Sequence, residues 1–393
     1  KISKFSEYLP MGSKNAKLGK EIALFQTYTP GVGTGRDVWV YNFSKEEISK
    51  NMKRQIEYCN KLDLNDPKFR KKVHDPKQVN LSRNTITRLK QSKAIFDKNK
   101  IQISLYRPFF KQYLYYDHTF NENPGLFSNF LPEKNSNNLF ISIPAKGMVG
   151  NFSTIISNVH IDYNHFSHPA LCFPLYVYEI GKKERKNNIS DEALKDYKIF
   201  YDDKKITKED IFYYVYGLLH HPKYCEKYAN NLAKEFPHIP MAPKFCEYVQ
   251  AGKKLAKLHL EYENGKKYNL GTPKNKKFGK LKKMSFGKNK IDGKISTNYS
   301  EIWINGVLVF DNIPKINYYV YGRTPIEWIV DRYKISIDKE SRIVNDPGNV
   351  DILSIIERIV YVGLESDKII KELPQEFEPK DWKRRKTGLE KFI

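Results

Sequence analysis

One short segment of the sequence has residues with the spacing of metal ligands. Its candidate ligands are His160, Asp162, His165, His168 and Cys172. Intervals of five, three and four residues separate the histidines and the cysteine, and such a set can supply Zn²⁺. Pro169 and the neighbouring aromatic residues instead indicate a loop that enters a strand, where histidines are solvated or hydrogen-bonded. We prefer that second interpretation and leave the metal open.

A glycine-rich stretch, Gly31–Gly35, resembles a cofactor loop at first sight. A loop that binds a dinucleotide or a methyl donor follows a strand, and an acidic residue comes about 20 residues later. Here Thr29-Pro30 precedes the glycines and the segment 36–41 (RDVWVY) follows them. Because the strand-to-helix context is missing, we interpret the stretch as a basic turn.

Motifs of several enzyme classes are absent from the sequence. It contains no NPPY- or DPPY-like tetrapeptide, no GxxxxGK[ST] phosphate loop, no GxSxG elbow and no HExxH zinc motif. No spacing favours a nucleophile paired with a histidine, and His220-His221 suits a helix end. We therefore predict no catalytic or cofactor-binding residue in this chain. A nuclease or methyltransferase site too divergent to be visible remains the enzymatic alternative.

Cations are the most abundant candidate functional groups. The 393 residues include 68 Lys and Arg against 45 Asp and Glu, which gives a net charge of +23. Polyanions are the usual partners of such a surface. Nucleic acid is favoured over membrane because the sequence shows no basic amphipathic anchor and no apolar run of about 18 residues. A lysine-rich coding bias is the alternative explanation.

The cations that could contact phosphates lie in three places. Arg36 follows the glycine turn, and Arg83 and Arg88 lie in the polar segment 81–90. The run 276–290 (KKFGKLKKMSFGKNK) interleaves lysines with phenylalanines, and its candidates are Lys276, Lys277, Lys280, Lys282, Lys283, Lys288 and Lys290. Lysines of this kind neutralise phosphates without reading sequence. A merely solvated hairpin is the alternative for this run.

The elements that must position these residues point to a mixed α+β fold. Length predicts two or three domains, and 40% hydrophobic residues with 14% aromatics exclude a wholly disordered chain. We expect a mixed or antiparallel sheet region with strands at 101–116, 139–143 and 171–178. A helical segment (207–260), a basic hairpin region (253–294) and a C-terminal helix around 352–360 flank it. In 253–294 we count 14 lysines against three acids, and its glycines predict flexible or hairpin-like backbone.

Local signals mark several element boundaries. Ser44 and Glu47 predict a capping box that opens a helix, and Ile48, Met52, Ile56 and Cys59 would share one face of it. Asn305-Gly306 between two apolar triplets predicts a hairpin turn. Thr324 to Glu327 is a second capping box with proline at the first helical position. Residues 63–100 are polar and basic, with Pro67 and Pro76 as helix breakers, and we expect the tail after Pro374 to fray.

Six segments resemble a known family, the single-chain type ISP restriction–modification enzymes. In IALFQTYTPGVGTGRDVWVYNFS (22–44), the matching positions are Gly31, Thr34, Arg36, Asp37, Trp39, Val40, Tyr41 and Asn42. The other segments are SLYRPFFKQYLYYD (104–117), CFPLYVYE (172–179), YVYGLLHHPKYCEKYANNLAKEFPHIP (214–240), YGRTPIEWIVDRY (321–333) and IVNDP (343–347). The resemblance covers nearly the whole chain, and the segment 214–240 is the most specific.

The resemblance implies a role in DNA recognition for this chain. In that family one polypeptide carries a nuclease, a helicase, an adenine-N6 methyltransferase and a C-terminal target recognition domain. Residues 1–100 would be a connector after the methyltransferase core, 101–335 the recognition domain, and 336–393 a C-terminal helical segment and tail. The chain begins with Lys1 rather than Met, so we expect a piece of something longer or a trimmed form.

We therefore predict a sequence-specific module that binds double-stranded DNA and positions one adenine for a partner methyltransferase. Arg107 and Arg323 join the DNA-contacting candidates, although Arg36 and Arg107 could hold the fold instead. S-adenosylmethionine, ATP and Mg²⁺ would be used by the other domains of the polypeptide. Four scattered cysteines favour a reducing compartment, hence a bacterial cytoplasm. A scaffold that binds RNA or acidic protein partners is a further alternative.

Overall fold

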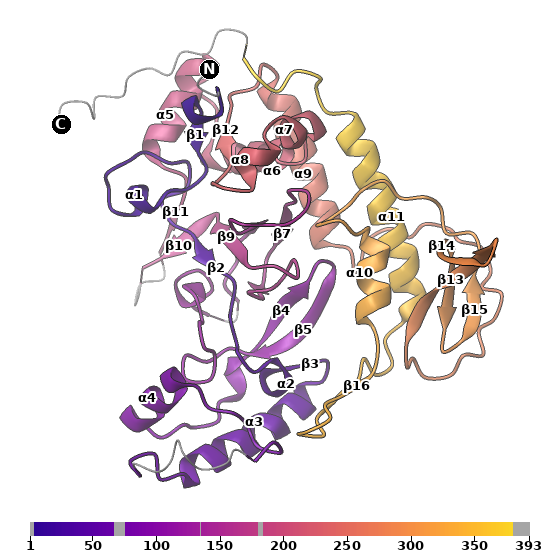
Figure 1. The fold of residues 1–393 in the computed structure, drawn as a ribbon. Coiled ribbons are helices and arrows are strands. Elements are labelled where there is room, and N and C mark those ends of the chain that lie inside the picture. Colours follow the sequence, from indigo (N-terminus) through magenta and orange to yellow (C-terminus); the bar gives the residue numbers. More distant parts are fainter. Residues whose placement is uncertain (1–3, 67–74, 134, 180–183, 380–393) are drawn as a thin grey trace.

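The computed structural model describes residues 4–66, 75–133, 135–179 and 184–379. It confirms the mixed α+β class (Figure 1). Helices and strands surround three clusters of buried apolar side chains. One cluster joins Phe5 near the N-terminus to Ile369 in the last long helix, and another joins Leu105 to Ile356. The division of the chain at residues 100 and 335 stays a prediction.

Two four-stranded sheets form the centre of the molecule, as the sequence predicted. The first is antiparallel and has the order β2 (Thr29–Pro30), β9 (Ala170–Pro174), β6 (Phe140–Pro144), β7 (Ile155–Ser157). The second is mixed, with the order β3 (Tyr41–Asn42), β5 (Phe110–Tyr115), β4 (Ile101–Arg107), β8 (His160–Ile161). In it β8 runs parallel to β4. A bridge between Val32 and Asp162 lies beside β8 and ties the glycine turn to this sheet.

Short elements and one long helix make up the N-terminal region. They are η1 (Lys4–Glu7), β1 (Leu9–Pro10), α1 (Lys14–Lys17), α2 (Asp37–Val40) and α3 (Lys45–Lys61). The predicted apolar face of α3 is buried. Ser44 accepts a hydrogen bond from the Glu47 amide, but the Glu47 carboxylate pairs with Lys50, so the second half of the predicted capping box was wrong. The Ser44 amide donates to Asn42 instead.

The segment 63–100 contains a helix that the sequence reading missed. Helix α4 (Arg83–Gln91) starts at Ser82, which accepts a hydrogen bond from the Thr85 amide. Its buried face consists of Thr85, Ile86 and Leu89. So small an apolar face gives a weak periodic signal, and tertiary packing supplies the rest of the stability. The turn η3 (Lys98–Lys100) then leads into β4, and η4 (Phe127–Asn129) follows β5.

A helical layer packs over the first sheet, and most of it lies in the segment 207–260 that the sequence predicted to be helical. It consists of α5 (Asp191–Phe200), α6 (Lys208–Leu218), α7 (Pro222–Lys227), α8 (Ala229–Leu232) and α9 (Phe245–Leu260), with strands β10 (Tyr176–Tyr178), β11 (Arg185–Asn187) and β12 (His238–Ile239). Helices α6 and α9 cross at Gly217 and Gly252. A Cβ on Gly252 would lie 1.9 Å from the Tyr213 carbonyl oxygen, so this crossing requires glycine.

The C-terminal region joins a three-stranded sheet to two packed helices. Its elements are β13 (Met284–Ile291), β14 (Lys294–Ile304), β15 (Val307–Phe310), α10 (Pro325–Arg332), β16 (Ser336–Ile337), β17 (Val344–Asn345) and α11 (Ile352–Lys371). The predicted Asn305-Gly306 turn is confirmed, with φ of 54° and 85°. The predicted capping box at Thr324 is also confirmed, with both hydrogen bonds formed.

The start of the predicted frayed tail is ordered. The carbonyl oxygen of Pro374 lies 2.9 Å from His221 Nε2, and Phe377 is buried. The Glu378 carboxylate accepts a hydrogen bond from Tyr8. The expectation was wrong here because aromatic side chains far away in sequence cover the segment. Residues 380–393 of the tail lie outside the described residues.

Candidate nucleic-acid interface

The lysines predicted to bind phosphates lie on a loop and on the strand that follows it. We call residues 274–283 the lysine loop. Its start is fixed to β15, since the Lys274 amide donates to the Val309 carbonyl. The exposed side chains of the loop and strand include Lys276, Lys277, Lys280, Lys282, Lys283, Lys288 and Lys290. Five of the seven candidates therefore lie on the lysine loop, and Lys288 and Lys290 lie farther along on β13.

Asn305 holds the lysine loop in one conformation. Its Nδ2 donates to the carbonyl oxygens of Phe278 (2.8 Å) and Lys280 (2.7 Å). Its Oδ1 accepts from the amides of Lys282 (2.8 Å) and Lys283 (3.1 Å). One amide side chain thus bonds four backbone groups of the loop. Of the flexible or hairpin-like backbone predicted for 253–294, the hairpin is present as the pair β13–β14.

The lysines of this region have few acidic neighbours. Lys280 Nζ lies 2.5 Å from the Asp346 carboxylate. Within the part of the chain that the structure describes, the other six candidate lysines have no carboxylate within 4.0 Å. An exposed lysine without an ion pair can neutralise a phosphate without first breaking a bond to the protein. This charge is therefore available to a polyanion.

Three of the predicted arginines, Arg36, Arg88 and Arg107, instead bind groups inside the fold. Arg36 is buried, donates to the Phe120 carbonyl, and donates to Thr85 Oγ1 at 2.9 Å. Burial lowers the pKa of Arg36, and Glu122, 3.6 Å away, opposes that shift. Arg88 Nη1 donates to the carbonyl oxygens of His118 (2.6 Å) and Asn121 (2.8 Å). These guanidinium groups hold the 117–123 loop against α4.

Arg107 forms a buried ion pair. Its Nη1 lies 2.7 Å from Asp162 Oδ1, and its guanidinium lies over the Tyr106 ring, 4.0 Å from the centroid. Burial, with Asp37 nearby, raises the pKa of Asp162 to about 7, against the opposing effect of Arg107. The pair joins β4 to the chain after β8, so the geometry favours the structural alternative for Arg107.

The two remaining arginine candidates are exposed. Arg83 is the first residue of α4 and points to solvent. Arg323 lies 3.0 Å from the Asp331 carboxylate and over the Trp328 ring at 5.1 Å. Neither belongs to the lysine loop, and their contact with DNA stays a prediction.

The predicted ligand-like cluster is spread through the interior. His160 packs between the rings of Tyr116 (4.5 Å) and Phe127 (5.2 Å), and burial lowers its pKa to about 3. Asp162 is occupied by Arg107, and His168 Nε2 lies 3.1 Å from the Ala145 carbonyl oxygen. Among the described residues, no three His, Cys, Asp or Glu side chains gather as metal ligands would.

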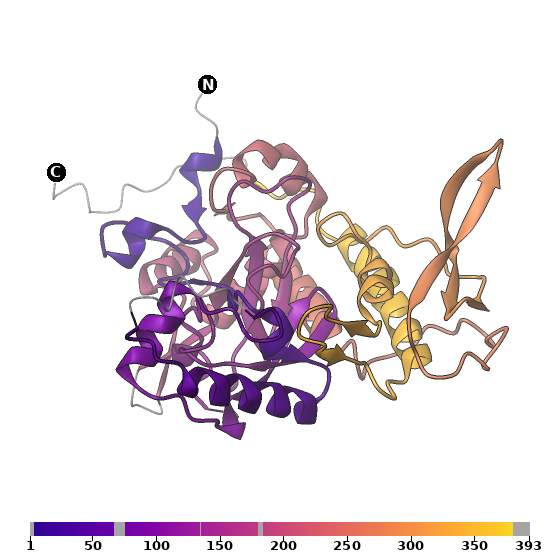
Figure 2. The ribbon, with the colours of Figure 1, turned by 60° about the horizontal axis from the view of Figure 1, so that its bottom comes forward.

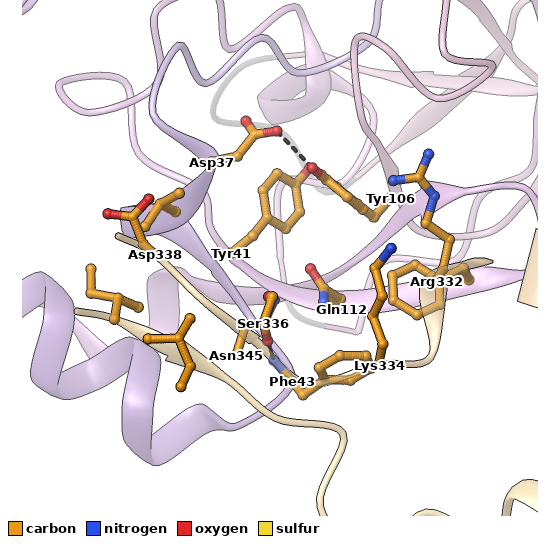
Figure 3. A pocket seen from close by; sticks show the side chains of 14 residues that line it. Asp37, Tyr41, Phe43, Tyr106, Gln112, Arg332, Lys334, Ser336, Asp338 and Asn345 are labelled. Carbon is orange, nitrogen blue, oxygen red and sulfur yellow. Dashed lines mark hydrogen bonds between the residues drawn. The ribbon is translucent and has the colours of Figure 1, made fainter. Parts of the chain in front are cut away.

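A pocket of about 320 Å³ lies between the second sheet and the chain that follows α10 (Figure 3). Its aromatic walls include Tyr41, Tyr106 and Phe110. Tyr106 donates a 2.8 Å hydrogen bond to Asp37 within it. The charged lining side chains are Asp37, Asp338, Arg332 and Lys334. Two acids balance two bases, so this pocket does not offer phosphates the excess positive charge that the lysine loop does.

Comparison with known families assigns the fold. A model of the type ISP C-terminal specificity domain matches residues 23–361. The chain belongs to this family. The match includes the whole lysine loop, both central sheets and the first half of α11. It confirms the family that the six sequence segments resemble.

Solved structures agree with this assignment of the specificity domain. The nuclease-deletion mutant of the type ISP enzyme LlaGI with a DNA substrate mimic is 30% identical, with a TM-score of 0.80 over 96% of this chain. The type ISP enzyme LlaBIII bound to DNA is 31% identical, with a TM-score of 0.83 over 95%. The DrdV–DNA complex is 30% identical, with a TM-score of 0.84 over 96%.

The specificity domain spans 29%, 24% and 39% of the LlaGI, LlaBIII and DrdV chains. No curated protein matches it. None of its described helices is both long and apolar enough to cross a membrane.

One residue that shapes the candidate interface of the specificity domain was missed by sequence reasoning. Asn305 was identified as a turn residue, but its side chain also fixes the lysine loop. The loop residues that it binds precede it by 22 to 27 positions. No local pattern marks an amide that bonds over this separation, because the contact exists only once the sheet has formed.

Proposed function

We propose that this specificity domain binds duplex DNA and recognises the target site of a type ISP restriction–modification enzyme. In this role it positions the target adenine for N6 methylation by a methyltransferase domain and directs restriction of unmodified sites. The domain itself supplies binding and orientation, and the chemistry belongs to other domains.

The main support for the proposal is the lysine loop, whose backbone is held by hydrogen bonds to the Asn305 side chain. Its exposed lysines match the requirement for phosphate neutralisation, which gives affinity that falls with salt. Because Asn305 fixes the backbone, the side chains start from a defined framework and less conformational entropy is lost on binding. The DNA-bound state of LlaGI, LlaBIII and DrdV supports the same function.

The proposal places the specificity domain beside the methyltransferase, helicase and nuclease domains of one polypeptide. S-adenosylmethionine, ATP and Mg²⁺ would be bound by those domains. The polypeptide would act in the bacterial cytoplasm, where the DNA is. The share of the LlaGI, LlaBIII and DrdV chains that the domain spans leaves room for such partners.

Duplex binding by the 393-residue chain tests the proposal. Fluorescence anisotropy with a labelled duplex, measured from 50 to 300 mM NaCl, should give an affinity that falls steeply as salt rises. With about six lysine–phosphate contacts the slope of log K against log salt would be about −5. Absence of binding at 50 mM NaCl, or binding insensitive to salt, would contradict the proposal.

Competition separates DNA recognition from general binding of polyanions. Unlabelled duplex DNA should displace the labelled duplex at lower phosphate concentration than an RNA hairpin or heparin does. Equal displacement by all three would favour a basic scaffold. Calorimetry with S-adenosylmethionine and a Mg²⁺-dependent cleavage assay test the enzymatic alternative, for which we expect no signal from this chain.

A further inference from the structure

The outer half of the β13–β14 ribbon projects from the molecule and is not needed by its core. We call residues 287–298 the arm, and Figure 2 shows the ribbon standing away from the body. Residues 288–290 and 292–297 are all exposed. An isolated two-stranded ribbon is at best marginally stable in water. A projecting ribbon of this kind therefore suits a surface that a partner covers.

The base of the arm sets its direction. The strand register shifts between Phe286 and Gly287, which places Tyr299 to Glu301 in an irregularity of β14. A Cβ on Gly287 would lie 2.8 Å from the Cβ of Glu301, and the Glu301 carboxylate accepts a hydrogen bond from Trp303 Nε1 at 2.9 Å. Gly287 and the hydrogen-bonded carboxylate of Glu301 therefore give the base of the arm a defined conformation.

The two faces of the arm differ in chemistry. Side chains of opposed residues share a face, and faces alternate along a strand. Lys288 opposes Thr297 and Lys290 opposes Ile295 on one face. On the other face Asn289 opposes Ser296 and Gly287 opposes Asn298, and Lys294 at the tip shares this face. We call these the lysine face and the amide face.

We propose that the arm enters the major groove of duplex DNA with its amide face toward the base edges. A two-stranded antiparallel ribbon fits the width of that groove. Asparagine amides and serine hydroxyls pair with the donors and acceptors that bases expose there, and asparagine pairs best with adenine. The lysine face then turns outward, and its long side chains reach the phosphates on either side. This inference rests on the proposed DNA binding.

Charge and composition favour DNA over a protein as the occupant. The arm carries Lys288, Lys290 and Lys294 against a single acid, Asp292. A protein-binding surface usually has an apolar, aromatic centre. The amide face instead presents Asn289 and Ser296, and no hydrogen bond within the described structure occupies either side chain. Unoccupied polar groups are the ones that can read base edges.

Asn298 has a restricted orientation that supports a reading role. Its Oδ1 accepts hydrogen bonds from the amide (3.2 Å) and the hydroxyl (2.7 Å) of Ser300. The NH₂ group is therefore the part left to donate outward. Residues on one face of a strand repeat every 7 Å or so. Base pairs repeat about every 3.4 Å, so the levels of Asn289 and Asn298 lie roughly two base-pair steps apart.

The experiment uses the 393-residue chain and a pool of duplexes with a randomised central segment. Bound duplexes are recovered and sequenced for the wild type, for Asn289→Ala/Ser296→Ala on the amide face, and for Lys288→Ala/Lys290→Ala on the lysine face. The wild type should enrich a motif. The amide-face variant should lose about tenfold discrimination at one or two positions of it and keep its affinity for the pool within about twofold.

The lysine-face variant is the matched control. It should keep the whole motif and weaken binding to every duplex, with the salt slope reduced by about 2. All four substitutions are at exposed positions, and circular dichroism with urea unfolding should show an unchanged fold.

The outcomes separate the two proposals. If the wild type binds no duplex, the proposed function fails and the arm inference falls with it. If the wild type binds and the amide-face variant enriches an unchanged motif, only the arm inference is wrong. Binding of the wild type with no preferred motif also overturns the reading role.

Discussion

The arginines of the N-terminal half and the lysines of the C-terminal region are used in opposite ways. Arg36, Arg88 and Arg107 direct their guanidinium groups at carbonyl oxygens or a carboxylate of the same chain. The lysines of the loop and ribbon point to solvent, and among the described residues only Lys274 and Lys280 of these have a carboxylate within 4.0 Å. Each of these cations adds one unit to the net charge, yet only the lysines offer their charge to a partner.

The difference follows from the chemistry of the two side chains. A guanidinium has five donors in a rigid plane and satisfies several buried acceptors at once, so it suits the interior. An ammonium group is compact and strongly hydrated, and remains in water on a flexible stem. The net charge therefore shows how much charge a partner can contact only when it is known which cations are exposed. Four predictions test this comparison.

The largest effect is expected from Arg107→Ala. The substitution leaves Asp162 buried without its partner, and removal of one member of a buried pair costs about 3–5 kcal/mol. We expect the lower end of that range, since the raised pKa lets Asp162 take up a proton. Urea unfolding measures the loss. Arg83→Ala, at an exposed position, is the control and should change stability by less than about 0.5 kcal/mol. If Arg107→Ala keeps its stability but loses affinity for DNA, Arg107 contacts DNA and does not hold the fold.

The next effect concerns the lysine loop. Simultaneous Lys276→Gln, Lys277→Gln, Lys282→Gln and Lys283→Gln should weaken duplex binding 10–100-fold at 150 mM salt. The salt slope should fall by about 3–4, since each lost phosphate contact removes about 0.9. The free energy of unfolding should stay within about 0.5 kcal/mol of the wild type, because the four side chains are exposed. If this variant keeps the wild-type slope of log K against log salt, the phosphate contacts are made by residues outside the lysine loop.

A pH effect distinguishes the buried interior from the exposed lysines. The pKa of His160 is lowered by burial to about 3, while an unfolded histidine has a pKa of about 6.5. The unfolded state thus binds a proton first as pH falls. The stability that comes from neutral His160 is complete above pH 6.5 and declines toward pH 3 by about 1.4 kcal/mol per pH unit.

His160→Phe should reduce that pH dependence by one proton, because phenylalanine packs between the same rings and does not titrate. Urea unfolding at pH 6.5, 5.5 and 4.5 measures the slope. An identical slope for His160→Phe and the wild type would show that His160 is not held neutral.

The smallest effect is expected from loss of the hydrogen bonds between the Asn305 side chain and the lysine loop. Asn305→Gly keeps a residue that tolerates positive φ in the turn but removes the four hydrogen bonds to the lysine loop. We expect a loss of about 1 kcal/mol in stability and a several-fold weaker affinity for duplex, because the loop must be ordered on binding. Asn312→Gly, which removes one hydrogen bond to the Leu270 carbonyl, is the matched control. Equal affinity of Asn305→Gly and the wild type would mean that loop order contributes nothing to binding.

Much of the fold was predictable where neighbours in sequence decide the outcome. The buried stripe of α3, the Asn305-Gly306 turn and the Thr324 capping box follow from rules that span a few residues. The strand pair 101–107 and 110–115 lies in the apolar, aromatic stretch 101–116, where Pro108 interrupts any helix and indicates a turn between two strands. Helix α4 was missed because three buried residues in nine make a weak pattern. The Glu47 half of the first capping box was lost to a competing pair with Lys50.

The sequence predicted the residue types of the candidate site. It did not predict which of these residues face solvent and which bind groups inside the fold. Sequence placed Lys276 to Lys290 in a basic run and left Arg36 and Arg107 open between two roles. The partners that separate those roles lie far along the chain, 84 residues from Arg36 to Phe120 and 55 from Arg107 to Asp162. Such contacts have no local signature. The amide and lysine faces of the arm likewise required the register of β13 against β14.

The sequence alone determined the class of fold, the family, the sign of the charge and the turns and caps that start its elements. These properties depend on composition, on motifs or on residues within one turn of each other. The tertiary structure alone decided which cations face solvent, which amide orders the lysine loop, and which side chains share a face of the arm. Each of these depends on chain segments that meet only when the sheets and helices pack.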